Sequence, residues 1–194
     1  LPELTNMRTM GSVPFGGRYR LIDFPLSNMV NSGISKVGVI TKSNYRSLID
    51  HLGTGKPWDL SRKREGMFIL PFISSSTNEY VLLCDCNTIC NIDINLLFDA
   101  HEQSGADITV AYCHGTVPAL NNTMTFDLDS DGRIKEIAIS SVGGEEGDYS
   151  LNVFLLKKSL LERLISQAAS MHYTDFERDL IQALSLIHIS EPTR

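Results

Sequence analysis

The chain has 194 residues, 42% of them hydrophobic, and a formal net charge of −6 at pH 7. This length and composition suffice for one globular domain with a buried core. The acidic balance argues against nucleic acid or an anionic membrane as a general partner, and no apolar run approaches the roughly 20 residues of a membrane-spanning helix.

The first third of the chain predicts helices and strands in alternation. Apolar residues at helical spacing predict a helix over 20–32 that ends at Gly33, followed by a short buried strand over 37–41. A second helix is expected over 43–52, with Ser43 as its N-cap.

The alternation continues to residue 169. The pattern predicts strands over 67–70, 80–84, 107–113 and 151–156, helices over 94–103 and 158–169, and a hairpin of strands 123–126 and 133–139. Near-continuous apolar runs are typical of parallel strands covered on both faces. The predicted fold is therefore α/β, a Rossmann-like three-layer domain with a mostly parallel sheet.

Three of the four cysteines form a C-x-C-x3-C pattern, and the fourth precedes a histidine: Cys84, Cys86, Cys90 and Cys113. That spacing is not a common zinc spacing. Buried free cysteines are favoured over a metal cluster or a disulfide framework.

The most informative segment is a glycine turn that carries arginines. Gly16 and Gly17 allow backbone angles that other residues avoid, and Arg18 and Arg20 place two fixed positive charges beside the turn. Such a turn next to a helix start can hold phosphate. An ordinary loop with two solvated arginines explains the pattern equally well.

The order of residues around this turn resembles a family signature. The stretch Phe-Gly-Gly-Arg-Tyr-Arg-Leu-Ile-Asp-Phe at 15–24 is similar to the Phe-Gly-Gly-Lys-Tyr-Arg-Leu-Ile-Asp-Phe of glucose-1-phosphate adenylyltransferases. The likeness extends over most of 1–183, and residues 50–63 resemble the companion regulatory branch called GlgD. Members of this family make ADP-glucose and pyrophosphate from ATP and glucose 1-phosphate with Mg²⁺, which supplies glycogen synthesis.

The resemblance places uncharged residues at two catalytic positions. The family's active-site lysine falls on Met10 and its metal-binding aspartate on Asn87. The Glu-Lys-Pro that holds the sugar phosphate is replaced by residues 138–141. The resemblance therefore implies a regulatory, poorly catalytic or non-catalytic subunit that assembles with a catalytic subunit in a cytoplasmic heterotetramer.

Two carboxylates remain as metal candidates. Asp175 matches the family's second metal aspartate, or serves as the N-cap of a following helix. Asp85 lies two residues before Asn87, on the same face of an extended chain, and is a candidate surrogate. The alternatives are thus an active nucleotidyltransferase that uses Asp85 and Asp175, or a non-catalytic nucleotide- or sugar-phosphate-binding module.

The same resemblance assigns a regulatory role to the turn. Family members carry a basic residue at the Arg18 position in an allosteric anion site. Arg18 is therefore the first candidate contact for a small anionic effector, and Arg20 is either a second contact or a structural residue.

Both ends and one internal segment depart from the family. The family's Gly-rich loop would precede Leu1, and the helical crossover expected between the strands at 67–70 and 80–84 is missing, since a crossover needs a dozen or more residues. Residues 184–194 read, codon by codon, as a translated transposase sequencing adapter. We therefore expect an incomplete nucleotidyltransferase domain over 1–183, a non-native tail over 184–194, and missing chain after Ala183.

Overall fold

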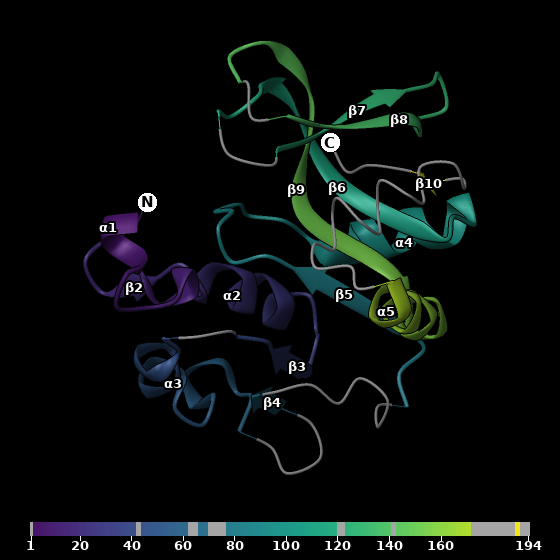
Figure 1. Ribbon diagram of the computed structural model, residues 1–194. Helices are drawn as coiled ribbons and strands as arrows, with labels where there is room; N and C mark the ends of the chain where they lie inside the picture. Colours follow the sequence, from purple (N-terminus) through teal and green to yellow (C-terminus); the bar gives the residue numbers. More distant parts are fainter. Residues whose placement is uncertain are drawn as a thin grey trace. The chain divides into compact units, whose positions relative to one another are not determined.

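The computed structural model describes residues 2–41, 44–61, 66–69, 77–119, 123–140, 143–171 and 189–190 (Figure 1). The chain divides into two compact units. Unit 1 comprises Leu1–Phe72 and Asp85–Ile94, and unit 2 comprises Ile73–Cys84 and Asn95–Arg194. Each unit has a hydrophobic core of its own.

Unit 1 combines short helices with a hairpin and a parallel strand pair. Its described elements are α1 (Pro2–Thr5), η1 (Met10–Ser12), β1 (Pro14–Phe15), β2 (Tyr19–Arg20), α2 (Asp23–Asn31), β3 (Lys36–Val39), α3 (Arg46–Leu52), η2 (Lys56–Trp58) and β4 (Gly66–Ile69). Strands β1 and β2 are antiparallel, and β3 and β4 are parallel.

The core of unit 1 lies between α2, α3 and the strand β3. Its buried members are Leu26, Val37, Val39, Leu48, Leu52 and Leu60. Helix α2 ends at Asn31, Gly33 just beyond it adopts φ +81°, and the N–H of Ile34 donates to the carbonyl of Met29 at 2.9 Å. This pattern of hydrogen bonds returns the chain toward β3 and confirms the predicted helix end.

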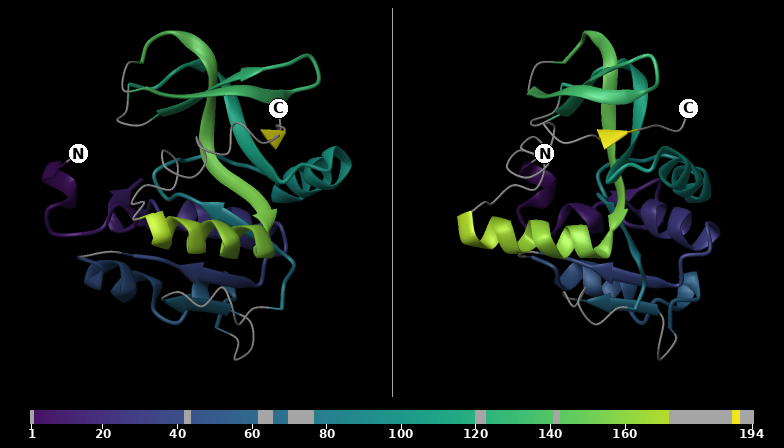
Figure 2. Two further views of the ribbon diagram at one scale, coloured as in Figure 1. Left: turned by 45° about the vertical axis from the view of Figure 1, so that its right-hand side comes forward. Right: turned by 90° about the vertical axis from the view of Figure 1, so that its right-hand side faces the viewer.

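Unit 2 is organised around the long strand β9. Its elements are β5 (Tyr80–Cys84), α4 (Ile94–Ser104), β6 (Ile108–Thr116), β7 (Thr123–Leu128), β8 (Arg133–Ser140), β9 (Glu146–Lys157), α5 (Lys158–Met171) and β10 (Ile189–Ser190). Strand β9 pairs with β5, β6 and β7, and it runs without a break from the β7–β8 hairpin to α5 (Figures 1 and 2).

Alternating side chains divide unit 2 into three layers. On β6, Ile108 and Val110 join a core that contains Leu160, Leu161 and Leu164 of α5. The intervening Thr109 bonds instead to His101 of α4. Because successive strand residues point to opposite faces, α4 and α5 cover opposite faces of the sheet.

The α/β class and the three-layer arrangement are confirmed, and each predicted strand and helix up to residue 171 has a counterpart. The prediction of a mostly parallel sheet holds only for β3 and β4, because the described pairings of unit 2 are all antiparallel. A continuous apolar run reports that both faces of a strand are covered, and it does not fix the direction of its neighbour.

Two helix starts differ from the prediction. Helix α2 begins at Asp23 rather than residue 20, because Tyr19 and Arg20 form strand β2 and the Arg20 N–H donates to Asp23 Oδ2 at 2.9 Å. Helix α3 begins at Arg46, with Tyr45 at the N-cap position. Ser43, the predicted N-cap, lies outside the described residues.

Several predictions fall on residues that the structure does not describe. These include most of the segment between Pro71 and Glu79, Asp175, and all of the 184–194 tail except Ile189 and Ser190. Those two residues form β10, antiparallel to Ile134 and Arg133 of β8. None of the described helices has the length and apolar character needed to cross a membrane.

Leu156 tests the core of unit 2. It lies on β9 and is fully buried. We expect Leu156→Ala to lower the free energy of unfolding by about 2–5 kcal/mol, since it deletes a packed side chain and leaves a cavity. The control Ile165→Ala, on the exposed side of α5, should change it by about 1 kcal/mol or less. Urea denaturation measures both values, and similar losses for the two variants would contradict this core.

Candidate functional site

The candidate site in unit 1 is built on the β1–β2 hairpin. Pro14 pairs with Arg20 and Phe15 with Tyr19, so the four-residue motif Gly-Gly-Arg-Tyr forms the turn and the start of β2. Gly16 and Gly17 adopt φ +58° and +87°. A side chain at either position would be strained, which is the physical reason for the glycine pair.

Arg18 presents its guanidinium group at the tip of this hairpin. The side chain is exposed, and its guanidinium carbon lies 5.4 Å from the centroid of the Tyr19 ring. Tyr19 and Phe15 are themselves 48% and 46% exposed, and both rings contact Phe24. The hairpin therefore displays a cation on an aromatic platform, where an anionic ligand can reach it.

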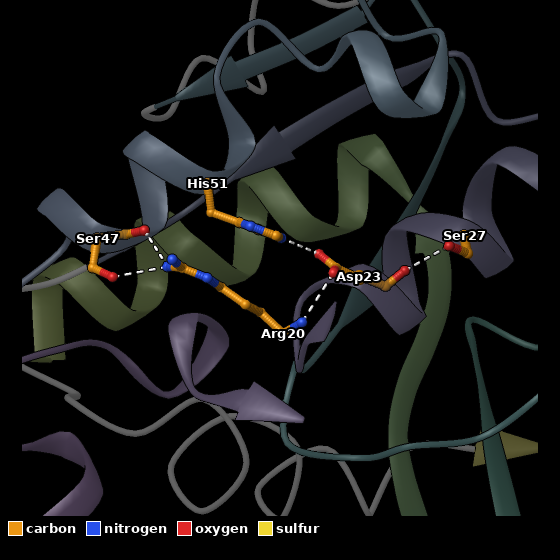
Figure 3. Close-up of polar contacts among 5 residues, drawn as sticks. All are labelled: Arg20, Asp23, Ser27, Ser47 and His51. Carbon is orange, nitrogen blue, oxygen red and sulfur yellow. Dashed lines mark hydrogen bonds and ion pairs between the residues drawn. The ribbon is translucent and has the colours of Figure 1, made fainter. Parts of the chain in front are cut away.

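Arg20 is used differently. Its Nη1 donates to the backbone carbonyl and, at 2.8 Å, to the Oγ of Ser47 (Figure 3). The guanidinium group thereby joins the hairpin to α3. These contacts favour the structural reading of Arg20 that the sequence left open.

Asp23 connects the same elements from the other side. Its Oδ2 accepts the Arg20 N–H at 2.9 Å, and its Oδ1 lies 2.6 Å from His51 Nε2 on α3 (Figure 3). Because an ionised carboxylate only accepts hydrogen bonds, His51 Nε2 carries the proton. Only 11% of the Asp23 side chain and 20% of the His51 side chain are exposed, so this pair is shielded from water.

Met10 and Asn87 lie on segments that the fold brings together. Met10 opens η1, and a Cβ placed on the next residue, Gly11, would lie 3.3 Å from the Sγ of Cys86. Met10 is therefore the chain neighbour of Gly11, and Asn87 is the chain neighbour of Cys86, the two residues at this close approach. Their thioether and carboxamide groups carry no charge, so neither can pair with a phosphate or neutralise a metal ion.

Asp85 and Asn87 are both exposed, whereas Cys86 between them is partly buried. Strand β5 ends at Cys84 and the chain bends at Cys86 and Asn87, so the alternation of an extended strand does not place Asp85 and Asn87 relative to one another. Asp85 Oδ1 accepts the N–H of Cys86 at 2.9 Å. Burial, together with the nearby charge of Asp85, raises the pKa of the Cys86 thiol to about 11. Cys86 therefore stays protonated at neutral pH and is a poor metal ligand and nucleophile.

A magnesium site is not supported by the described donors. No group of three or more His, Cys, Asp or Glu residues suited to a metal occurs among the residues that the structure places. Asp85 contributes one carboxylate and Asn87 a neutral amide, and Asp175 lies outside the described residues. The four cysteines are partly buried thiols outside any disulfide.

Sequence reasoning missed Ser47 and His51 as partners of the hairpin. They lie 27 and 28 residues from Arg20 and Asp23, and no local pattern links them. It also missed Thr9, whose Oγ1 is buried next to Met10 without a hydrogen-bond partner among the described residues.

Comparison with known proteins identifies the family to which the chain belongs. The profile of the nucleotidyl transferase family matches residues 1–137. The chain is 39% identical over 153 residues to the glycogen biosynthesis protein GlgD of Bacillus subtilis (strain 168), which covers 66% of this chain and 45% of that protein. It is 41% identical over 157 residues to GlgD of Geobacillus stearothermophilus, with 68% and 46% covered.

A second group of relatives matches almost the whole chain. The glucose-1-phosphate adenylyltransferase of Clostridium perfringens (strain 13 / Type A) is 32% identical over 209 residues, covering 93% of this chain and 52% of that protein. The chain therefore spans about half the length of these relatives. Because that alignment is longer than the chain itself, the relative contains positions that this chain lacks.

Asp23 provides a test of the hairpin anchor. We expect Asp23→Asn to lower the free energy of unfolding by about 1–3 kcal/mol, because an amide cannot accept hydrogen bonds from both Arg20 and His51. The matched control Asp50→Asn changes an exposed carboxylate on α3 and should stay within about 0.5 kcal/mol of the parent. Chemical denaturation measures both, and equal stability of the two variants would rule out the anchor.

Proposed function

Because the chain belongs to the nucleotidyl transferase family, we propose that it is part of a glucose-1-phosphate adenylyltransferase subunit of the regulatory, GlgD-like kind. In this proposal the whole protein acts in glycogen synthesis, in the cytoplasm, beside a catalytic subunit that makes ADP-glucose and pyrophosphate from ATP and glucose 1-phosphate. The observation that carries the proposal is the uncharged pair Met10 and Asn87 at the two catalytic positions.

Catalysis of nucleotidyl transfer depends on charged groups in the active site. Transfer of a nucleotidyl group needs positive charge near the phosphates and carboxylates that hold the metal, because negative charge develops on the transferring group. The Met10 side chain carries no charge, and the Asn87 amide is a neutral ligand that attracts Mg²⁺ more weakly than a carboxylate does. Removing one such electrostatic contact from an active site typically costs a factor of about 10² to 10³ in rate. The absence of charge at both Met10 and Asn87 therefore favours a regulatory role over a catalytic one.

The arginine hairpin supports the regulatory part of the proposal. Arg18 is exposed at the tip of the turn, with its guanidinium carbon 5.4 Å from the centroid of the Tyr19 ring, whereas Arg20 is held by Ser47. An accessible guanidinium group suits the recognition of a carboxylate or phosphate on a small effector. We assign that contact to Arg18 and a positioning role to Arg20.

The alternative is an active nucleotidyltransferase that holds its metal with Asp85 and Asp175. The exposed carboxylate of Asp85, two residues before Asn87, is the observation in its favour. A non-catalytic binding module outside glycogen synthesis has no specific contact to recommend it.

Pyrophosphate release separates these functions. We expect the full-length protein containing this chain, assayed without a partner in ATP, glucose 1-phosphate and Mg²⁺, to release almost none. Met10→Lys combined with Asn87→Asp should raise the rate by about 100-fold or more, because it restores two electrostatic contacts. The matched control is Met7→Lys with Asn91→Asp, which adds the same charges at two exposed positions of unit 1. A parent protein as fast as a catalytic subunit would overturn the proposal and favour the alternative.

The effector contact has its own test. In the complex with a catalytic subunit, Arg18→Ala should raise the half-maximal concentration of an anionic effector by about tenfold, through loss of a charge-assisted hydrogen bond. Inorganic phosphate and glucose 6-phosphate serve as probes, and activity is measured across their concentrations. Arg46→Ala, an exposed arginine on α3, is the control. Identical response curves for Arg18→Ala and the parent would remove this role from the hairpin.

A further inference from the structure

Segment Asp85–Ile94 carries position 87 and belongs to unit 1, although its chain neighbours Cys84 and Asn95 belong to unit 2. Residues 85–93, all of them described, form neither helix nor strand. The hydrogen bonds of a ladder or a helix therefore do not fix this segment. Its position depends on contacts that other residues of unit 1 make with its backbone and side chains.

Two residues at the end of α2 bond to the backbone of this segment. Asn28 Nδ2 donates to the carbonyl of Cys90 at 2.9 Å, and the N–H of Ile94 donates to Ser32 Oγ at 3.0 Å. Ser32 follows Asn28 by one helical turn, so both side chains lie on the same side of the helix end. Both bonds join residues 62 positions apart in the chain, so the segment runs beside the helix end in the same direction as α2.

These two bonds satisfy backbone groups of the segment. Ile94 is the first residue of α4, and the first N–H groups of a helix have no acceptor within it. Ile94 is only 6% exposed, and a buried N–H that loses its acceptor destabilises the state in which it is buried. Ser32 supplies that acceptor, and Asn28 supplies a donor to the Cys90 carbonyl.

The other end of the segment packs against η1. A Cβ placed on Gly11 would lie 3.3 Å from Cys86 Sγ, so glycine leaves the space that the thiol occupies. Cys86 directly precedes Asn87 in the chain. Helix α2 is a firm support for the segment, because Leu26 is buried in the core of unit 1 and Asp23 bonds to the hairpin and to α3.

We propose that Asn28 and Ser32 are positioning residues, which clamp segment Asp85–Ile94 to α2 and thereby hold position 87 next to the close approach of Cys86 to η1. The clamp makes position 87 move with the unit that carries Met10 and the arginine hairpin, although the chain on both sides of the segment belongs to unit 2. That position 87 is a catalytic position rests on the proposed function, whereas the clamp itself does not.

Two local rates test the clamp in the 194-residue chain. Hydrogen exchange of the Ile94 amide, followed by NMR, reports on the bond to Ser32. Labelling of Cys86 by N-ethylmaleimide, located by mass spectrometry, reports on the other end of the segment, because a buried thiol reacts slowly. We expect Asn28→Ala and Ser32→Ala each to speed both processes by about tenfold, since loss of one hydrogen bond favours the open state by about that factor. Ser32→Thr keeps the hydroxyl acceptor and should restore the parent rates.

A matched variant and an internal reference control this experiment. Asn31→Ala removes an exposed amide from the same end of α2 and should leave both rates unchanged. Cys113 of unit 2 is the reference, because general unfolding would speed its labelling as well. The proposal is overturned if Asn28→Ala behaves like Asn31→Ala, if Ile94 exchanges faster while Cys86 is labelled at the parent rate, or if labelling of Cys113 rises as much as that of Cys86. Neither rate depends on pyrophosphate release, so the clamp and the proposed function can be judged apart.

Discussion

The carboxylate of Asp23 fixes the geometry on which the rest of unit 1 depends. It accepts the N–H of Arg20 at the end of the hairpin and contacts His51 on α3. The hairpin is short, and its own strands form only two residue pairs. A two-stranded hairpin of that length is not stable in water by itself. Its position comes from the contacts of Arg20 with Asp23 of α2 and with Ser47 of α3, and from the contact of Asp23 with His51 of α3.

Because of these contacts, Arg18 and Arg20 have different roles. The Arg20 guanidinium group is hydrogen-bonded to Ser47, whereas Arg18 follows the glycine turn and is exposed. A ligand could therefore reach Arg18 without displacing a protein partner of Arg20. The chemistry of the neighbouring segments points in the same direction, since Met10 and Asn87 offer no charge and the Cys86 thiol stays protonated. Unit 1 thus presents an exposed cation at the hairpin and uncharged side chains at positions 10 and 87.

Unit 2 depends on a different constraint, the alternation of side chains along its strands. Even-numbered residues of β6 face α5 and Thr109 faces α4, so each helix has its own surface of the sheet. Where α4 ends and α5 begins, the sheet edge carries Tyr80 and Lys157 as direct partners. A cavity at this edge is lined by residues of β5, α4, β9 and α5 and of the loop before β6.

The sequence by itself determined the elements and the character of the site. Helical spacing, apolar runs and the glycine stop at Gly33 are local signals, and they located the longer helices and strands but not the short elements α1, η1, β1, β2, η2 and β10. The order of residues around the turn indicated the family, and residue identity alone established that positions 10 and 87 are uncharged. Only the tertiary structure decided which strands are antiparallel, that Arg20 is bound by Ser47, and that His51 meets Asp23. The two side-chain contacts span 27 and 28 residues, and β5 and β6 pair with β9 from distant parts of the chain. No local pattern encodes these pairings, because the free energy that selects them comes from packing and from the need to satisfy buried polar groups.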